Sequence, residues 1–267
     1  MTIQIPIFAL SSQGLNRSTL GSAFEFKFET PLRIPSNTMP TVSLYSASVW
    51  YNTPNLSNEL DNNKLVVSFS NVNEGDQRIL IFSKGLYSLQ SVNAALNAKL
   101  IEISGFGGSE IILVANNSEQ RLYIRCSPST ASGDITIHFE SEASTIKEFL
   151  GFIGTDTPFE TNGSVNNILG DSTAKFNSLS YYVISCSLSQ GAYAPNGSFN
   201  NSQLAAIIPQ SVTPGSLIVY NPVNTIRCQS NLAGATVSRC VFTLTDQNGD
   251  PIDCIEEEWS AQIVVEY

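Results

Sequence analysis

Apolar and polar side chains alternate strictly near both ends of this 267-residue chain. Successive side chains of a β-strand point to opposite faces, so this period of two predicts strands with one buried face. We therefore expect both ends to be core strands of one β domain, with the Phe-rich strand as the neighbour of the last strand. The apolar positions are Phe24, Phe26 and Phe28 near the start, and Trp259, Ala261, Ile263, Val265 and Tyr267 at the end.

Short runs of the same kind recur along the chain, separated by turn residues. Strands at intervals of about 8 to 12 residues predict a sandwich or a barrel. Because the first and last strands both suit the core, we predict an all-β fold, a single jelly-roll sandwich with one short helix-containing insertion. The further expected strands are 39–51, 65–69, 79–82, 111–115, 122–126, 135–139, 182–188, 216–220 and 236–245.

Three local features interrupt or modify this strand pattern. The apolar parity of residues 39–51 changes near Leu44 and Tyr45, which predicts a β-bulge. Residues 89–100 carry a helical stripe of Leu and Val after Ser88, a plausible N-cap. Residues 144–150 predict a short helix that is capped by Ser144 and ends at Gly151. Residues 155–171 are expected to form a loop.

The length is compatible with a single domain of this class. We expect residues 1–21 to form an N-terminal arm, within which residues 2–10 are extended or form an edge strand. Residues 22–267 are expected to form the jelly roll. The stretch 84–152 is where a helix-containing subdomain would be inserted.

Charge argues against several classes of function. The net charge is −10 and the 13 Lys and Arg residues are scattered, so we expect no direct contact with nucleic acid. The acids between Asp246 and Glu266 suit a solvated rim better than a divalent-cation site shared with a neighbouring subunit, because Asp246 and Asp250 lack the spacing of a calcium loop.

Targeting and redox signals are also weak. No stretch of about 20 apolar residues is present, so we expect no membrane span. The start lacks the features of a secretion signal, and the five cysteines form no C-x-x-C pair. We therefore expect folding in a reducing compartment without a disulfide framework.

Catalytic groups are scarce. His138 is the only histidine, and its parity predicts an exposed strand residue more readily than a metal ligand or part of a Ser-His-Asp triad. The acids Glu256, Glu257 and Glu258 would alternate between faces of a strand, and the glycine-rich residues 105–108 lack the lysine of a phosphate loop. We therefore predict no enzyme, no catalytic, cofactor-binding or metal residues, and no cofactor.

The order of elements is similar to that of the penton, or minor capsid, proteins of virophages and polinton-like viruses. The resemblance covers roughly residues 22–267 and consists of core and turn residues. It comprises Phe24–Phe28 with Pro31-Leu32, Thr41–Tyr51 with Asn52, Ile79–Phe82, Gly85–Leu89, Phe149–Phe152, Ser185–Tyr193, Pro214-Gly215, Tyr220–Val223, and a final hairpin around Asp246–Gly249.

This resemblance implies a structural protein of an icosahedral virion. A single jelly roll with upright strands would assemble as a homopentamer at the vertices, beside hexon-like major capsid proteins. The virion would be assembled inside the host cell, and the N-terminal arm would be expected to contact neighbouring capsomers.

Two alternatives share the fold class. A carbohydrate-binding β-sandwich would use exposed aromatic residues such as Trp50, Tyr181 and Tyr193, although aromatic residues on strands more often lie in the core. A virion spike or fibre head would assemble as a trimer.

Overall fold

The structure is a computed structural model that describes residues 3–71, 76–103, 109–128, 132–154, 156–160, 166–176, 179–189, 203–207 and 212–267. The chain divides into two compact units. The first, Met1–Thr53 with Leu179–Tyr267, is called the jelly-roll unit below, and the second, Pro54–Ser178, the inserted unit. Both ends of the chain lie in the jelly-roll unit, as their alternation predicted.

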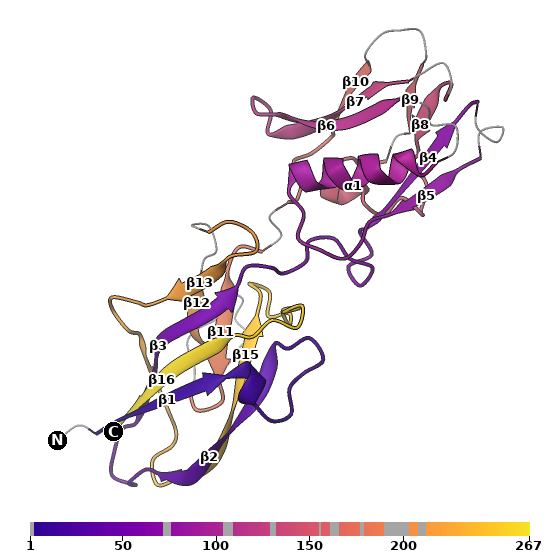
Figure 1. The fold of residues 1–267 in the computed structure, drawn as a ribbon. Helices are drawn as coiled ribbons and strands as arrows, with labels where there is room; N and C mark the ends of the chain where they lie inside the picture. The colour runs from indigo at the N-terminus through magenta and orange to yellow at the C-terminus, as the bar shows by residue number, and fades with distance from the viewer. Residues whose placement is uncertain are drawn as a thin grey trace. The chain divides into compact units, whose positions relative to one another are not determined.

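Two antiparallel sheets form the layers of the jelly-roll unit (Figure 1). One sheet has the order β1-β16-β3-β13, with β14 also paired to β3, and the other has the order β12-β11-β15-β2. The strands are β1 Gln4–Leu10, β2 Ala23–Arg33, β3 Thr41–Trp50, β11 Tyr182–Cys186, β12 Gln203–Ile207, β13 Leu217–Tyr220, β14 Arg227–Gln229, β15 Thr236–Thr245 and β16 Ser260–Glu266, with a 3-10 turn at Ser11–Gln13.

The strand pairing follows a long hairpin rolled up on itself. β1 pairs with β16, β2 with β15, β3 with β13 and β14, and β11 with β12. Two further pairs, β16 with β3 and β15 with β11, join these into the two sheets. This pairing forms the two Greek keys of a jelly roll, so the predicted all-β jelly-roll fold is confirmed.

The neighbour predicted for the last strand is wrong. β16 lies between β1 and β3, whereas the Phe-rich β2 lies in the opposite sheet. The two strands meet across the core, where the centroid of the Phe24 ring lies 5.0 Å from that of the Trp259 ring and 5.4 Å from that of the Phe242 ring. Alternation indicates that each strand has a buried face. It does not indicate whether two such strands are neighbours in one sheet or lie in opposite sheets of the sandwich.

Within the stretch 1–21, residues 4–10 form β1 as an edge strand, with Ile7 and Ala9 buried. An edge strand was one of the two forms expected for residues 2–10. Ile3 and Tyr267 exchange both backbone hydrogen bonds, so every second residue faces β16 and Pro6 faces away. A proline is tolerated in β1 because its missing N–H lies at the free edge of the sheet.

The predicted β-bulge in β3 is confirmed. Gln262 pairs with Ser46, but the next residue of β16, Ile263, pairs with Leu44. Tyr45 is therefore the extra residue. Leu44 and Ala47 are three residues apart, yet both point inward and are buried, because the extra residue shifts the alternation by one position.

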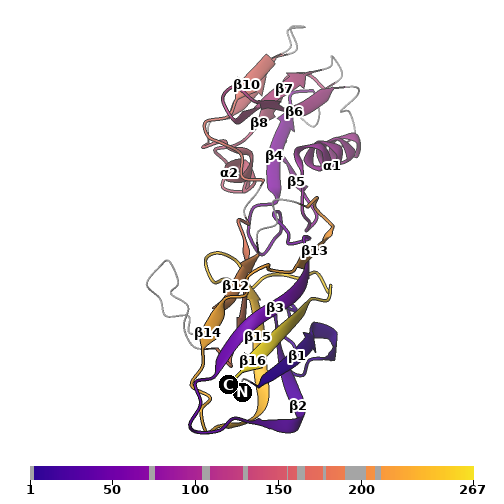
Figure 2. The ribbon, with the colours of Figure 1, turned by 90° about the vertical axis from the view of Figure 1, so that its left-hand side faces the viewer.

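The inserted unit contains two more antiparallel sheets, β5-β4-β8-β9 and β10-β7-β6, and both described helices (Figure 2). Its core is a continuous cluster of buried residues from both sheets and from α1, including Val67, Leu96 and Ile124. The elements are β4 Lys64–Phe69, β5 Arg78–Ile81, α1 Leu89–Ile101, β6 Glu110–Asn116, β7 Arg121–Ser127, β8 Ile135–Ile137, α2 Lys147–Leu150, β9 Thr157–Phe159 and β10 Asn166–Leu169.

The helix predictions are confirmed for α1 and corrected for α2. Ser88 and Ser91 form a reciprocal capping box at the start of α1. Ser144 does not cap α2, since its hydroxyl accepts a hydrogen bond from the Val66 N–H instead. Gly151 ends α2 in the left-handed conformation, as expected.

The inserted unit extends from Pro54 to Ser178, and the stretch 84–152 that was considered for an insertion lies within it. The expected loop at 155–171 contains β9 and β10. The amide of Asn55 donates a hydrogen bond to the carbonyl of Phe176, so the beginning and end of the inserted unit lie together. No helix within the described ranges is long and apolar enough to span a membrane.

Candidate functional site

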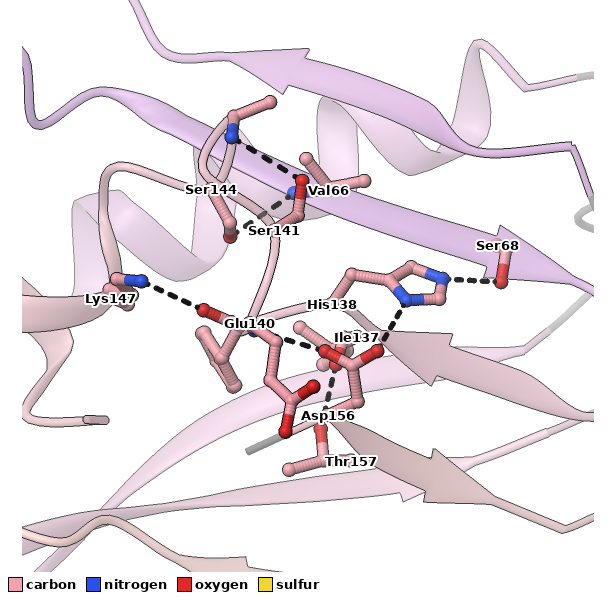
Figure 3. A network of polar contacts seen from close by, with 12 residues as sticks. Val66, Ser68, Ile137, His138, Glu140, Ser141, Ser144, Lys147, Asp156 and Thr157 are labelled. Atoms are coloured by element: carbon pink, nitrogen blue, oxygen red, sulfur yellow. Dashed lines mark hydrogen bonds and ion pairs between the residues drawn. The ribbon is translucent and has the colours of Figure 1, made fainter. Parts of the chain in front are cut away.

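A network of polar side chains in the inserted unit surrounds His138 (Figure 3). The imidazole Nε2 lies 2.8 Å from the Ser68 hydroxyl, and Nδ1 lies 2.9 Å from Oδ2 of Asp156. Ser68 is on β4, His138 directly follows β8, and Asp156 directly precedes β9. One residue therefore lies within β4, and the other two lie next to the ends of β8 and β9.

Strand register brings these residues together. Ser68 pairs with Thr136, and two residues further on the His138 N–H donates to the carbonyl of Val66. Ser68, Thr136 and His138 therefore share the face of the sheet that is opposite to the core. His138 was predicted to be exposed, but only 14% of its side chain is, because Asp156 and Ser68 lie on either side of the ring.

Asp156 is the electrostatic partner of the histidine. Partial burial raises the pKa of the Asp156 carboxyl. Hydrogen bonds from His138 and from the Glu140 N–H, together with the charge of the histidine, lower this pKa by more than burial raises it. The pKa of Asp156 therefore lies below its ordinary value of 3.8. A ring that carries a proton on Nδ1 donates it to Asp156, and its Nε2 lies within hydrogen-bond distance of the Ser68 hydroxyl.

This geometry is that of a Ser-His-Asp triad, which the sequence made improbable. The position of the serine argues for a structural role. Hydrogen bonds from His138 to Val66 and from Ser70 to Asp134 place Ser68 and Thr136 in a bonded pair, so the Ser68 N–H is used in the ladder. Nucleophilic serines instead lie on sharp turns whose free N–H groups stabilise an oxyanion. The network therefore holds β4, β8 and the start of β9 together.

Asp246, the first of the late acidic residues, stabilises the turn that follows it. Oδ1 of Asp246 accepts hydrogen bonds from the backbone N–H groups of Asn248 and Asp250, at 2.8 and 2.9 Å. A carboxylate that caps a turn in this way has a local structural role. Among the residues that the structure describes, no group of three His, Cys, Asp or Glu side chains is arranged to hold a metal ion.

All five cysteines are free and buried. Burial raises the pKa of the Cys126 thiol to about 12 and that of Cys254 to about 11. A hydrogen bond with Cys186 and burial together raise the pKa of Cys240 strongly. Thiols in this state are poor nucleophiles, so they act as small core side chains.

The aromatic residues considered for carbohydrate binding are not fully exposed. Trp50, at the end of β3, and Tyr181, directly before β11, are each half-buried. Tyr193 and the glycine-rich residues 105–108 lie outside the described residues.

Comparison with known proteins reveals a likeness of fold. No protein-family model matches the chain, and no curated protein matches it by sequence. The crystal structure of the selenomethionine-labelled mavirus penton protein is similar, with a TM-score of 0.50 over 99% of this chain and 99% of that chain. The sequence identity is 13%, so the likeness concerns the fold.

Proposed function

We propose that this chain is a structural capsid protein that forms the pentameric vertex, or penton, of an icosahedral virion. The observation that carries the proposal is the likeness of fold to a penton protein, which extends over 99% of both chains and so includes the inserted unit as well as the jelly roll. The order of elements expected from the sequence, which is similar to that of pentons of virophages and polinton-like viruses, supports the same role.

The proposal specifies location and partners. The protein resides in the capsid of the virion, which is assembled inside the host cell. It assembles as a homopentamer, and its neighbours in the shell are hexon-like major capsid proteins. With a net charge of −10, it contacts no nucleic acid directly.

Purified full-length chain at high concentration tests this assignment. Sedimentation velocity is expected to give a species of five times the 28.9 kDa chain mass, and negative-stain electron microscopy is expected to give five-fold rings. A chain that stays monomeric at every concentration and forms no rings would contradict the proposal. A trimer would support a spike or fibre head instead.

The proposed role is structural rather than enzymatic. The Ser68–His138–Asp156 network is the one arrangement described above that resembles a catalytic site, and Ser68 lies within a strand. A fluorophosphonate probe is therefore expected to leave Ser68 unlabelled, as judged by mass spectrometry beside a serine hydrolase treated in parallel. Stoichiometric labelling that is lost in Ser68→Ala would assign a hydrolytic function to the inserted unit.

The carbohydrate-binding alternative depends on Trp50 and Tyr181, which retain partly exposed rings. Binding on a glycan array at micromolar strength that is lost in Trp50→Ala or Tyr181→Ala would favour it. We expect no such binding.

A further inference from the structure

One sheet of the jelly-roll unit has an exposed apolar face on the side opposite to the core. In this sheet, formed by β1, β16, β3, β13 and β14, the inward residues are buried and the residues between them point outward. Figures 1 and 2 show β1, β16 and β3 side by side. The outward side of this sheet is called the outer face below. Its exposed large side chains are Phe8 (61% exposed), Tyr45 (56%), Leu217 (40%) and Val219 (62%).

The polar side chains of the outer face bond to one another across the strands. The Ser46 hydroxyl on β3 donates to Oε1 of Gln262 on β16, at 3.2 Å. The hydroxyls of Ser48 and Ser260 on the same two strands are 2.7 Å apart. Polar groups that already have protein partners lose less when water is removed, so this face can be covered at a low desolvation cost.

The outer face has no net charge. The five strands are described in full, and they contain two charged residues, Glu266 and Arg227. These two form an ion pair of 3.1 Å, and the amide of Gln4 donates a further hydrogen bond to Glu266. The rest of the face is uncharged from Phe8 on β1 to Val219 on β13.

The opposite sheet differs in its outward residues. Glu25 and Lys27 on β2 and Arg239 on β15 alternate with the inward aromatic and cysteine residues. Arg239 forms an ion pair with Glu25 at 3.1 Å, and its side chain is largely exposed. A charged outward face of this kind is the ordinary solvated side of a sandwich, whereas aromatic enrichment and depletion of charge mark the core of an interface.

We infer that the outer face is the surface on which a second copy of this chain packs. The net charge of the chain indicates that the occupant of this face is a second copy rather than a basic partner. Each chain carries −10, so two copies repel wherever their acidic surfaces meet, and they can approach closely only at a face without net charge. A basic partner would instead bind to the acidic residues that lie outside this face. The inference rests on the proposed pentamer and assigns one of its contact surfaces.

Two substitutions at opposite edges of the outer face test the assignment in the full chain. Val219→Asp and Phe8→Asp place a carboxylate on an exposed position, so folding should be retained and the second copy repelled. We expect the concentration at which half of the chain is assembled to rise at least about tenfold in each variant. The matched control is Ile79→Asp on β5 of the inserted unit, since Ile79 is likewise an exposed strand residue (53%).

Sedimentation velocity measures the assembly, and unchanged thermal melting establishes that each variant folds. Pentamers that persist in Val219→Asp and Phe8→Asp at wild-type concentrations would overturn the assignment of the face while leaving the pentamer intact. A wild-type chain that never assembles would instead contradict the proposed function. The outcomes are therefore distinct.

Salt provides a second readout on the wild-type chain. Because the acidic copies repel and the outer face contributes no net charge to the contact, raising the salt from about 0.05 to about 0.5 M should strengthen assembly. Weaker assembly at high salt would mean that the contact depends on opposite charges and would contradict the use of this face.

Discussion

At the scale of single residues, Asp156 links the His138 ring to the backbone of Glu140. Asp156 accepts hydrogen bonds from the His138 ring and from the Glu140 N–H with its two oxygens. One neutral amide cannot replace both acceptors with the same geometry. The carboxyl is therefore expected to contribute to the stability of the inserted unit.

Asp156→Asn is expected to lower the free energy of unfolding by about 1 kcal/mol at neutral pH, a modest value because the carboxyl is 37% exposed and partly screened by solvent. Since the folded state lowers the pKa of Asp156 below 3.8, its contribution is present above that pH and lost as the pH falls through the lowered value. The difference from wild type should therefore close in strong acid.

Urea denaturation as a function of pH measures this difference. Glu119→Gln, at an exposed position in the turn between β6 and β7, is the control and should change little. An Asp156→Asn variant as stable as wild type at neutral pH would show that the network does not hold the strands.

The buried thiols make a second prediction at the residue scale. Burial raises the pKa of Cys126 to about 12 and that of Cys254 to about 11, so little thiolate is present near pH 8. Ellman's reagent is expected to react with none of the five cysteines in the folded chain and with all five after unfolding in guanidinium. Rapid reaction of a folded-state thiol would contradict the burial.

At the scale of elements, Gly151 carries the turn that ends α2. Its φ is +85°, and the N–H groups of Gly151 and Phe152 return to the carbonyls of Glu148 and Lys147. A Cβ at this position would collide with the carbonyl oxygen of Ser172. Side-chain size and backbone conformation therefore both require glycine.

Gly151→Ala is expected to destabilise the inserted unit by more than about 2 kcal/mol, since left-handed strain and a backbone collision add. Gly215→Ala is the matched control. Its φ is +82°, but a Cβ there meets nothing within 4 Å, so only the strain of about 1 kcal/mol remains. Equal losses in the two variants, measured by chemical denaturation, would mean that the collision with Ser172 is relieved.

At the scale of the whole molecule, we propose that the inserted unit is a domain placed between β3 and β11 of the jelly roll. Its core cluster draws every member from residues 54–178. The hydrogen bond from Asn55 to Phe176 closes it at its two ends. In the jelly-roll unit, the hydroxyls of Thr53 and Tyr182 are 3.0 Å apart, so the two points where the chain leaves and returns are also adjacent.

The isolated fragment 54–178 is expected to fold on its own, with a cooperative thermal transition and dispersed amide resonances. The complementary chain, in which a short Gly-Ser linker joins Thr53 to Leu179, is expected to retain the jelly roll and its assembly. If the fragment were unfolded while the full chain was folded, the two units would be interdependent.

The sequence alone determined the elements that carry a long local pattern. Alternation over ten residues predicts β15 at its observed bounds, the parity change locates the bulge of β3 at Tyr45, and helical spacing with Ser88 predicts α1. The sequence did not predict β9, β12 and β14, which have three to five residues and lie in stretches without a clear alternation.

Only the tertiary structure decided which strands are neighbours and which polar residues meet. Residue 24 faces Trp259 across the core, although both strands have the same pattern as sheet neighbours would have. Likewise, Ser68 and Asp156 reach His138 from 70 and 18 residues away in the chain. A period of two specifies a buried face and leaves its partner open, because pairing depends on the path of the whole chain rather than on local side-chain order.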